Sequence, residues 1–218
     1  MMVYGEAAAA DFLRRWLADK QDIVLVSGRT SYSRSGAEAI LVPHLRGKRV
    51  VHLTTVGENA RPEDVEEKRR LLPKKIDAFI AVGGGTTMDT TKLLRNGFPD
   101  SIHEGAPYLA IPTTAGSGAE TTRFAVYYDR DKKMSADDER YLPTDVVLIP
   151  ALAESQTPYQ RAATEFDAYA QAVESLWSKR ATAESREYAK KALDLMAGGQ
   201  QMLGAYWAGR AIDISRTT

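Results

Sequence analysis

Short runs of apolar, largely β-branched residues recur along the first two-thirds of the chain, separated by longer stretches of mixed polarity. The runs cover residues 23–26, 50–53, 78–82, 108–111 and 146–149. Because such runs are apolar on both faces, they are typical of strands buried on both sides in a parallel sheet. The stretches between them, roughly 5–19, 34–46, 61–75 and 87–96, have helical composition. The pattern predicts an open α/β unit over residues 1–152.

One segment departs from this alternation of strands and helices. Residues 122–128 and 132–135 have the pattern of two strands, and Asp129-Arg130-Asp131 lies between them. A short polar turn that joins two β-prone runs indicates a hairpin. We therefore expect an inserted β-hairpin near the edge of the sheet.

After Pro150 the strand pattern ends, and the remaining chain is helical in character. An apolar stripe at helical spacing consists of Phe166, Ala170, Val173 and Trp177. A polar stripe one residue further along the chain consists of Asp167, Gln171 and Glu174. Two or three helices are too few to enclose a core of their own. We expect residues 153–218 to be the first part of a helical domain that lies against the α/β unit, a partner chain or a further segment.

Composition narrows the functional class. The 29 Lys and Arg residues balance 29 Asp and Glu residues, so no excess of positive charge favours nucleic acid or an anionic membrane. The chain has no cysteine, which excludes disulfides and thiolate chemistry and suits a reducing compartment. The first residues lack the pattern of a signal peptide, and no apolar run approaches the ~18 residues of a membrane span. We expect a cytoplasmic protein.

The strongest chemical signal is a run of three glycines, Gly83, Gly84 and Gly85, between a predicted strand and a predicted helix. Glycine lets the backbone approach a pyrophosphate, and the start of the following helix presents N–H groups and a positive dipole end. The simpler alternative is a tight strand-to-helix turn that needs glycine only for its backbone. The motif favours phosphate binding over that alternative.

A second loop, residues 111–122, also follows a predicted strand. Its five hydroxyl side chains are Thr113, Thr114, Ser117, Thr121 and Thr122. Such a loop offers the short donors and acceptors that a ribose, a carboxamide or a phosphate needs, although an ordinary polar loop has the same composition. Because open α/β sheets bind ligands at the carboxyl ends of their strands, the two loops together predict a dinucleotide-binding domain over residues 1–152.

The sequences of these two loops resemble those of the iron-containing alcohol dehydrogenase superfamily, whose fold is shared with glycerol dehydrogenase and 3-dehydroquinate synthase. The resemblance continues through residues 132–135, 142–146 and 164–168. It implies a Rossmann-like open parallel sheet followed by an incomplete, all-helical, dehydroquinate synthase-like domain. It also implies NAD(P) as the cofactor.

The resemblance also implies roles for individual residues. It assigns the pyrophosphate and its loop to Gly83, Gly84, Gly85, Thr86 and Asp89. It assigns the nucleotide and nicotinamide pocket to Thr113, Thr114 and Ser117. It directs Lys133, the candidate catalytic residue, toward the cofactor ribose or the substrate.

The divalent metal of the family is harder to place. Asp167 matches its first ligand, but Gln171 stands at the usual position of a histidine one turn later. An alternative for Asp167 is an ordinary carboxylate on the helix surface. The histidines, His44, His52 and His103, all lie in the α/β unit. We expect iron or zinc only in a complete enzyme, and we favour truncation over a natural short form or a branch that works with fewer ligands.

Within the superfamily, residues 27–32, 167–175 and 208–218 resemble the phosphonoacetaldehyde reductase branch. This implies NAD(P)H-dependent reduction of a small aldehyde, phosphonoacetaldehyde, to the primary alcohol 2-hydroxyethylphosphonate. An anionic substrate needs cations nearby, and the candidates are Arg29, Arg34 and Arg210. We expect little or no turnover from this chain alone.

Cofactor choice and two other functions stay open. The second predicted strand ends in residues 52–55 without an acidic residue for a ribose hydroxyl, which favours NADP or dual use. One alternative function is a catalytically inactive, nucleotide-binding short form. The other is a cyclase of the dehydroquinate synthase kind, which needs metal ligands that are not found here. An exposed helical face would promote association, so a homo-oligomer also stays open.

Overall fold

The computed structural model describes residues 1–55, 57, 59–96 and 105–216, and its main sheet has six parallel strands. The strands are β1 (Met2–Tyr4), β2 (Asp22–Gly28), β3 (Arg49–Thr55), β4 (Ala78–Gly83), β5 (Tyr108–Pro112) and β8 (Asp145–Leu148). Their order is β1-β8-β5-β4-β2-β3. The five predicted strands are present, while β1 was not predicted and pairs with β8.

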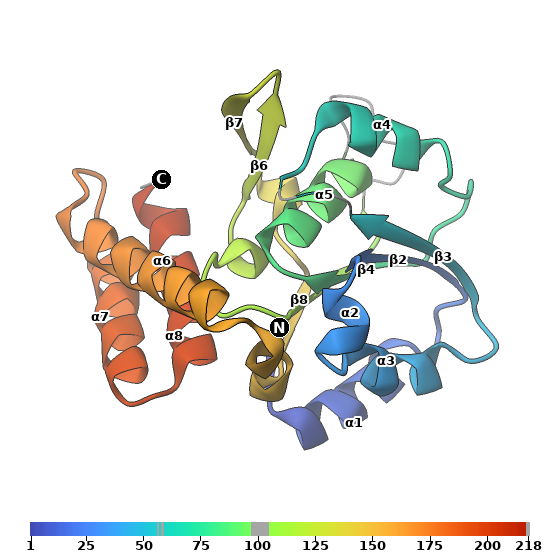
Figure 1. Ribbon diagram of the computed structural model, residues 1–218, viewed down its shortest axis with the longest axis horizontal. Helices are drawn as coiled ribbons and strands as arrows, with labels where there is room; N and C mark the ends of the chain where they lie inside the picture. Colours follow the sequence, from blue (N-terminus) through green and yellow to red (C-terminus); the bar gives the residue numbers. More distant parts are fainter. Residues whose placement is uncertain (56, 58, 97–104, 217–218) are drawn as a thin grey trace.

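Helices cover both faces of this sheet (Figure 1). One face carries α1 (Glu6–Trp16), α2 (Ser31–Arg34) and α3 (Ala37–Leu45), and the other carries α4 (Pro62–Arg69) and α5 (Gly85–Asn96). Along β2, Ile23 and Leu25 belong to the core beneath α1, α2 and α3, while Val24 and Val26 belong to the core beneath α4 and α5. This alternation follows from the two-residue period of a strand, and it explains why the runs are apolar throughout.

Two predicted helices are shorter than expected. The stretch 34–46 is divided between α2 and α3 because Gly36 adopts a left-handed conformation, with φ of 86°. The stretch 61–75 is helical only to Arg69. Pro73 follows within one turn, and the residue before a proline is disfavoured in a helix.

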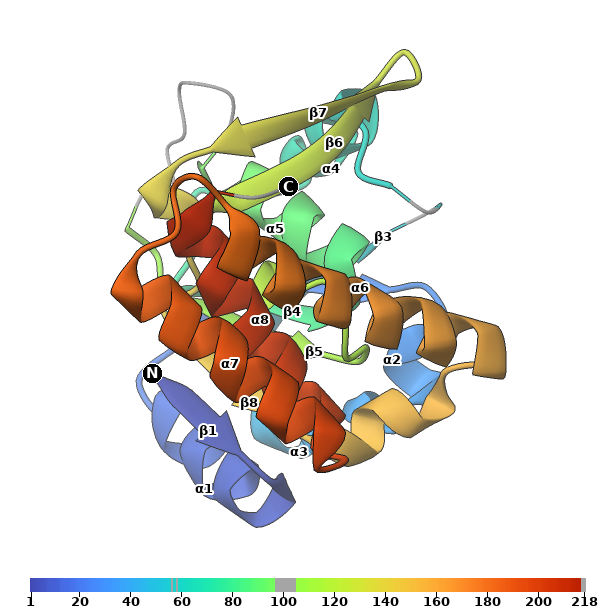
Figure 2. The same ribbon diagram turned by 90° about the vertical axis from the view of Figure 1, so that its left-hand side faces the viewer.

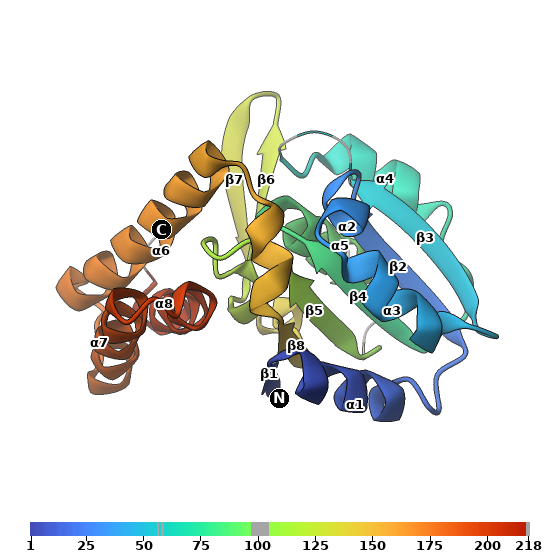
Figure 3. The ribbon, with the colours of Figure 1, turned by 60° about the horizontal axis from the view of Figure 1, so that its bottom comes forward.

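The hairpin consists of β6 (Phe124–Asp129) and β7 (Lys132–Asp137), which form a separate two-stranded antiparallel sheet. Arg130 and Asp131 have positive φ values of 44° and 66°, as a two-residue hairpin turn requires. β6 packs against α5 and α4 rather than extending the main sheet, so its predicted place at the sheet edge is corrected. The hairpin projects between the sheet side and the helical side of the molecule (Figures 1 and 3).

A 3-10 helix (Pro150–Ser155) leads into the helical part, which consists of α6 (Pro158–Trp177), α7 (Ala183–Ala197) and α8 (Gln201–Ser215) (Figure 2). Thr157 and Thr182 begin α6 and α7 with capping boxes. The proposed domain boundary at residue 152 falls within the 3-10 helix, and it stays a prediction. None of the described helices has the length and apolar character needed to cross a membrane.

The apolar stripe predicted for α6 is not its packed face. Phe166 and Trp177 are 72% and 80% exposed, whereas the side chains buried on α6 are Ala168, Ala172 and Ser175. The three helices meet through Ala172, Ala192 and Ala208. Small side chains allow close approach of helices but bury little apolar area, so this core is slight, as the sequence led us to expect.

Candidate functional site

The two predicted loops lie side by side at the carboxyl edge of the sheet. β4 and β5 are neighbours, and Gly83 pairs with Pro112 in their register. The backbone N–H of Thr113 donates a hydrogen bond of 2.9 Å to the carbonyl oxygen of Gly83. α5 begins at Gly85, so the N-terminal end of a 12-residue helix lies beside the second loop.

The three glycines are needed for different reasons, and none has a positive φ. A Cβ on Gly83 would collide with the side chain of Thr87, so this glycine lets α5 pack against the sheet. A Cβ on Gly84 would lie 3.3 Å from Thr114, and one on Gly85 would lie 3.1 Å from Ser117 Oγ. For Gly83 the strand-to-helix turn is a sufficient explanation, while Gly84 and Gly85 let the second loop approach closely.

Two adjoining cavities of about 290 and 530 Å³ form one cleft between α5, the hairpin and α6. Both are lined by Asp89, Ser117, Val126, Lys133 and Asp167. The smaller cavity adds Gly85 and Thr86, and the larger adds Gln171 and Glu174. The structure therefore brings most of the predicted site residues to one place, although they come from distant parts of the chain.

Four predicted residues are not part of the lining of this cleft. Gly83, Gly84, Thr113 and Thr114 do not line it. Thr113 is 2% exposed, and its Oγ1 has no hydrogen-bond partner among the described atoms. The side chain of Thr114 lies against Gly84. These residues hold the two loops against each other through the Thr113–Gly83 hydrogen bond and the Gly84–Thr114 contact.

The donors and acceptors in this cleft fit a dinucleotide cofactor. The first turn of α5 has N–H groups that no helical carbonyl accepts, and it carries the positive end of the helix dipole. Thr86 and Ser117, whose side chains carry hydroxyls, line the same cavity. Gln171 Oε1 is buried without a partner among the described atoms, while its Nε2 donates to the Ser117 carbonyl at 3.1 Å. A buried acceptor without a partner is expected to meet a water or another donor.

Lys133 is the cation among the described lining residues, and its charge acts on the carboxylates of Asp89 and Asp167; Glu174 lines the same cleft. Burial raises the pKa of the Asp89 carboxyl, and the neighbouring Lys92 ammonium opposes this rise. Burial also raises the pKa of Asp167, against a hydrogen bond with Gln171 and the charge of Lys133. The carboxylates disfavour a phosphate deep in the cleft and favour groups with N–H or O–H donors.

The described side chains do not form a divalent metal site. Among the described residues, no cluster of three His, Cys, Asp or Glu side chains could hold an ion. Beside Asp167, Gln171 offers only an amide. His44 lies in α3, and His52 lies in β3, where its Nε2 is 2.8 Å from Ser27 Oγ. His103 and the final residues 217–218 lie outside the described residues.

The three arginines considered for an anionic substrate do not line the cleft. Arg29 and Arg34 are exposed next to the end of β2 and in α2. Arg210 lines a separate cavity of about 120 Å³ with Glu120 and Tyr206. Burial raises the pKa of Glu120 to about 7. The position of Arg210 could not be predicted from the sequence, because it depends on how α8 packs against the rest of the chain.

Strand order corrects the argument about cofactor choice. In dinucleotide-binding sheets, the ribose is recognised at the end of the strand next to the one that carries the glycine loop. β4 has two neighbours, β5 and β2; β5 carries the second loop, and β3 is not adjacent to β4, so β2 is the strand to consider. The relevant positions are therefore Gly28 and the exposed Arg29, rather than residues 52–55.

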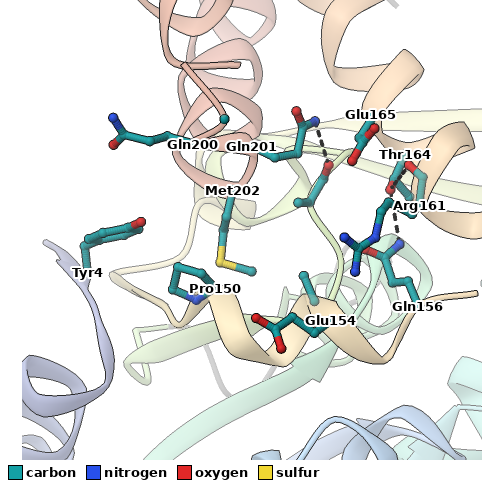
Figure 4. Close-up of a pocket in the computed structure, with 13 residues that line it drawn as sticks. Tyr4, Pro150, Glu154, Gln156, Arg161, Thr164, Glu165, Gln200, Gln201 and Met202 are labelled. Carbon is teal, nitrogen blue, oxygen red and sulfur yellow. Dashed lines mark hydrogen bonds between the residues drawn. The ribbon is translucent and has the colours of Figure 1, made fainter. Parts of the chain in front are cut away.

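A further pocket of about 230 Å³ lies between the 3-10 helix, the start of α6 and the turn from α7 to α8 (Figure 4). Gln156 Nε2 donates to Thr164 Oγ1 at 3.1 Å on one side of it, and Gln201 Nε2 donates to the Ala115 carbonyl at 3.3 Å on another. It contains none of the predicted site residues. We therefore place the candidate site in the cleft that Lys133 lines.

Sequence reasoning assigned no role to Lys92, although it belongs to the same glycine motif. Its side chain is fully buried, and burial lowers the pKa of its ammonium while Asp89 opposes this. A lysine one turn after the glycine-loop acid was the available signal. Only the fold shows that this lysine points inward.

Comparison with known proteins shows the family of this chain. Residues 1–150 match the family described as iron-containing alcohol dehydrogenase. Phosphonoacetaldehyde reductase of Streptomyces viridochromogenes is 30% identical over 186 residues, which are 69% of this chain and 47% of that protein. The chain therefore spans about half the length of this relative.

Two solved structures show the same fold. An iron-containing alcohol dehydrogenase from Thermotoga maritima has a TM-score of 0.87 and 22% identity, over all of this chain and 68% of that one. Sulfoacetaldehyde reductase from Bifidobacterium kashiwanohense, solved with NAD+, has a TM-score of 0.85 and 24% identity, over all of this chain and 66% of that one. By the match over residues 1–150, the chain belongs to the iron-containing alcohol dehydrogenase family.

Proposed function

We propose that this chain is the cofactor-binding unit of an NAD(P)H-dependent enzyme that reduces a small aldehyde to a primary alcohol. The observation that carries the proposal is the meeting of the two loops at the cleft that Gly85, Ser117 and Lys133 line. Its relatives include an aldehyde reductase, and a structural neighbour was solved with NAD+. Bound NAD(P)H supplies the hydride for such a reduction.

Different residues of the chain bind different parts of the cofactor. Backbone N–H groups at Gly85 and Thr86 hold a phosphate at the start of α5. The Ser117 hydroxyl and the orphaned Gln171 Oε1 orient the neutral part of the cofactor. Lys133 Nζ, on the opposite wall, donates hydrogen bonds to a ribose or a substrate oxygen. The hairpin and α6 limit access of water to the cleft between them.

Calorimetric titration of the chain with NADH and NADPH tests this proposal. We expect binding, and we expect Gly85→Ala to weaken it roughly ten-fold, because a Cβ 3.1 Å from Ser117 Oγ pushes the two loops apart. Gly198→Ala is the matched control, since its Cβ would lie 3.4 Å from the nearest atom, an ordinary contact. No binding by the unaltered chain, or equal weakening in both variants, would overturn the proposal.

For cofactor choice, we propose that NADPH binds at least as tightly as NADH. An acidic residue at the end of the strand next to β4 would repel a 2′-phosphate, and Gly28 and Arg29 stand there instead. In Arg29→Glu the NADPH affinity should fall and the NADH affinity should stay. A fall in both would show that Arg29 does not read the 2′-phosphate.

Phosphonoacetaldehyde is the first substrate to test, because of the relative that reduces it. The cleft itself has one lysine against three carboxylates, so its described walls supply little attraction for a phosphonate. We propose that the isolated chain turns over little or nothing, since its α6 wall lacks a metal site. Robust metal-dependent turnover by this chain would refute that part.

The alternative is a nucleotide-binding protein without catalysis. Gln171 in the place of a metal-binding histidine favours it. An experiment on a longer open reading frame, where one encodes further residues, distinguishes the two proposals. The longer protein should reduce an aldehyde under the first proposal and should show no turnover under the second.

A further inference from the structure

The root of the hairpin, Thr122 to Phe124, is held by buried charged side chains from two directions. On the sheet side, Lys92 Nζ donates to Thr122 Oγ1 at 3.2 Å and to the Phe124 carbonyl at 2.5 Å. On the helical side, Arg123 forms an ion pair with Asp213 of α8, with 3.0 Å between Nη2 and Oδ2. We call these two sets of contacts anchors. Lys92 holds Thr122 and Phe124, and Asp213 holds Arg123 between them.

Only the anchor on the sheet side continues into the cleft. Lys92 Nζ lies 3.4 Å from Asp89 Oδ1, and the Asp89 carboxylate accepts a hydrogen bond from the backbone N–H of Val126. Val126 and Asp89 both line the cleft. The pair Asp89–Lys92 therefore joins α5 to β6 at Phe124 and Val126, and to Thr122 just before β6. The Arg123–Asp213 pair lies outside the lining of the cleft.

Burying the Lys92 ammonium costs desolvation free energy, which its partners must offset. An unpaired charge in a protein interior is strongly unfavourable, and it persists only with good partners. Among the described residues, the hydrogen-bond partners of Lys92 belong either to the helix that follows the glycine loop or to the hairpin root. The position of this charge therefore fixes the hairpin relative to the glycine loop.

We propose that Asp89 and Lys92 are a positioning pair that holds the hairpin, and with it Lys133, over the nucleotide end of the cleft. The inference rests on the proposed function for the identity of the ligand. Lys133 lies on β7, opposite Tyr128 of β6, and it reaches the cleft only if β6 keeps its place on α5. The hairpin's contact with Ala60, whose carbonyl accepts from Tyr128 N–H at 2.9 Å, holds its far end but not its root.

The test compares Lys92→Met with Asp213→Asn in the full chain. Each variant removes one buried charge that holds the hairpin root, so both should lower stability. We expect Lys92→Met to weaken NADH binding roughly ten-fold and Asp213→Asn to change it less than about two-fold, measured where both variants are folded. Equal weakening in the two variants, or none in Lys92→Met, would overturn the proposal.

A spectroscopic signal separates positioning from general stabilisation. In lysine-labelled protein, the side-chain NMR signal of Lys133, assigned with Lys133→Met, should shift on NADH addition in the unaltered chain and in Asp213→Asn. It should not shift in Lys92→Met. A normal shift in Lys92→Met would show that the pair does not place Lys133.

If Lys92→Met does not fold, the double variant Asp89→Asn/Lys92→Met removes both charges and leaves no unpaired ion. We expect it to fold, to bind NADH weakly and to exchange the amide hydrogens of β6 faster than the unaltered chain. Unchanged exchange in β6 would overturn the proposal whatever the ligand is. Failure of the unaltered chain to bind NADH would instead count against the proposed function alone.

Discussion

The two walls of the cleft are supported by hydrophobic cores of different size. The wall made by α5 and the loop after β5 rests on a sheet that is buried on both faces by large aliphatic and aromatic side chains. The wall made by α6 stands on three helices whose shared core consists of alanines, and it leaves Phe166 and Trp177 exposed. The nucleotide end is thus firmly supported, whereas the end that would hold a metal has neither the ligands nor a large core.

The difference teaches that the two halves of the site depend on different interactions. The glycine loop is shaped by contacts within the α/β unit, such as Thr87 against Gly83. The polar stripe of α6 reaches the cleft because α8 packs on the loop before the hairpin, where Gly118 and Gly209 approach so closely that a Cβ on Gly118 would lie 2.6 Å from Gly209 Cα. Changes at this seam alter the second wall without disturbing the first.

The largest expected effect is on the free energy of unfolding, and it compares the cores behind the two walls. Phe79→Ala, within β4, should lower the free energy of unfolding by about 3–5 kcal/mol, because it leaves a cavity in a fully buried core. Phe166→Ala, on the exposed side of α6, should change it by less than about 0.5 kcal/mol. Urea denaturation measures both. Similar losses would mean that α6 is packed in solution in a way that the structure does not contain.

A smaller effect concerns the seam between the walls, where Glu120 lies in the 3-10 turn Ala119–Thr121. Burial raises the pKa of Glu120 to about 7, so the folded state favours the protonated carboxyl. Its stabilising contribution is complete below the unfolded pKa of about 4.3 and is lost as the pH rises through about 7. Relative to Glu120→Gln, the unaltered chain should lose roughly 3 kcal/mol between about pH 4 and pH 8.

Denaturation at a series of pH values checks this prediction. The glutamine variant serves as the control because it keeps the shape of the side chain and cannot ionise. Other carboxyls, such as Asp77 with its pKa of about 2, contribute equally to both proteins. Parallel stability profiles for the two proteins would show that Glu120 does not titrate in the buried state.

The smallest expected effect concerns the metal end. Zn²⁺ should leave the stability of the unaltered chain nearly unchanged, whereas Gln171→His adds a second ligand one helical turn after Asp167. The variant should gain about 1 kcal/mol when the metal exceeds its Kd roughly five-fold. Asp167→Asn in the same background is the control. A clear gain by the unaltered chain would reveal a metal site that the described side chains do not form.

The parts of this account that the sequence predicts are those set by local pattern. The buried strands follow from continuous apolar runs, and the meeting of the two loops follows because both come after parallel strands. The three-residue strand β1 was missed because so short a segment has no period of its own and depends on pairing with β8. The order of β2 and β3 beside β4 also has no local signal, which is why the ribose argument began at the wrong strand.

For α6, the prediction of the packed face assumed that large apolar side chains lie in the core. The helix instead packs through Ala168, Ala172 and Ser175, and its larger residues face outward. The inward direction of Lys92 was equally hidden, because a lysine in a helix is normally solvated. Both features depend on neighbours that are distant in sequence.

The most direct test of the central claim is an amide chemical-shift map of the chain during titration with NADH. We predict shifts at Gly84 to Thr86 and at Thr114 to Ser117, and none around Gln156 and Gln200 in the separate pocket of Figure 4. Shifts confined to that separate pocket, or no shifts at saturating cofactor, would contradict the assignment of this cleft to a dinucleotide.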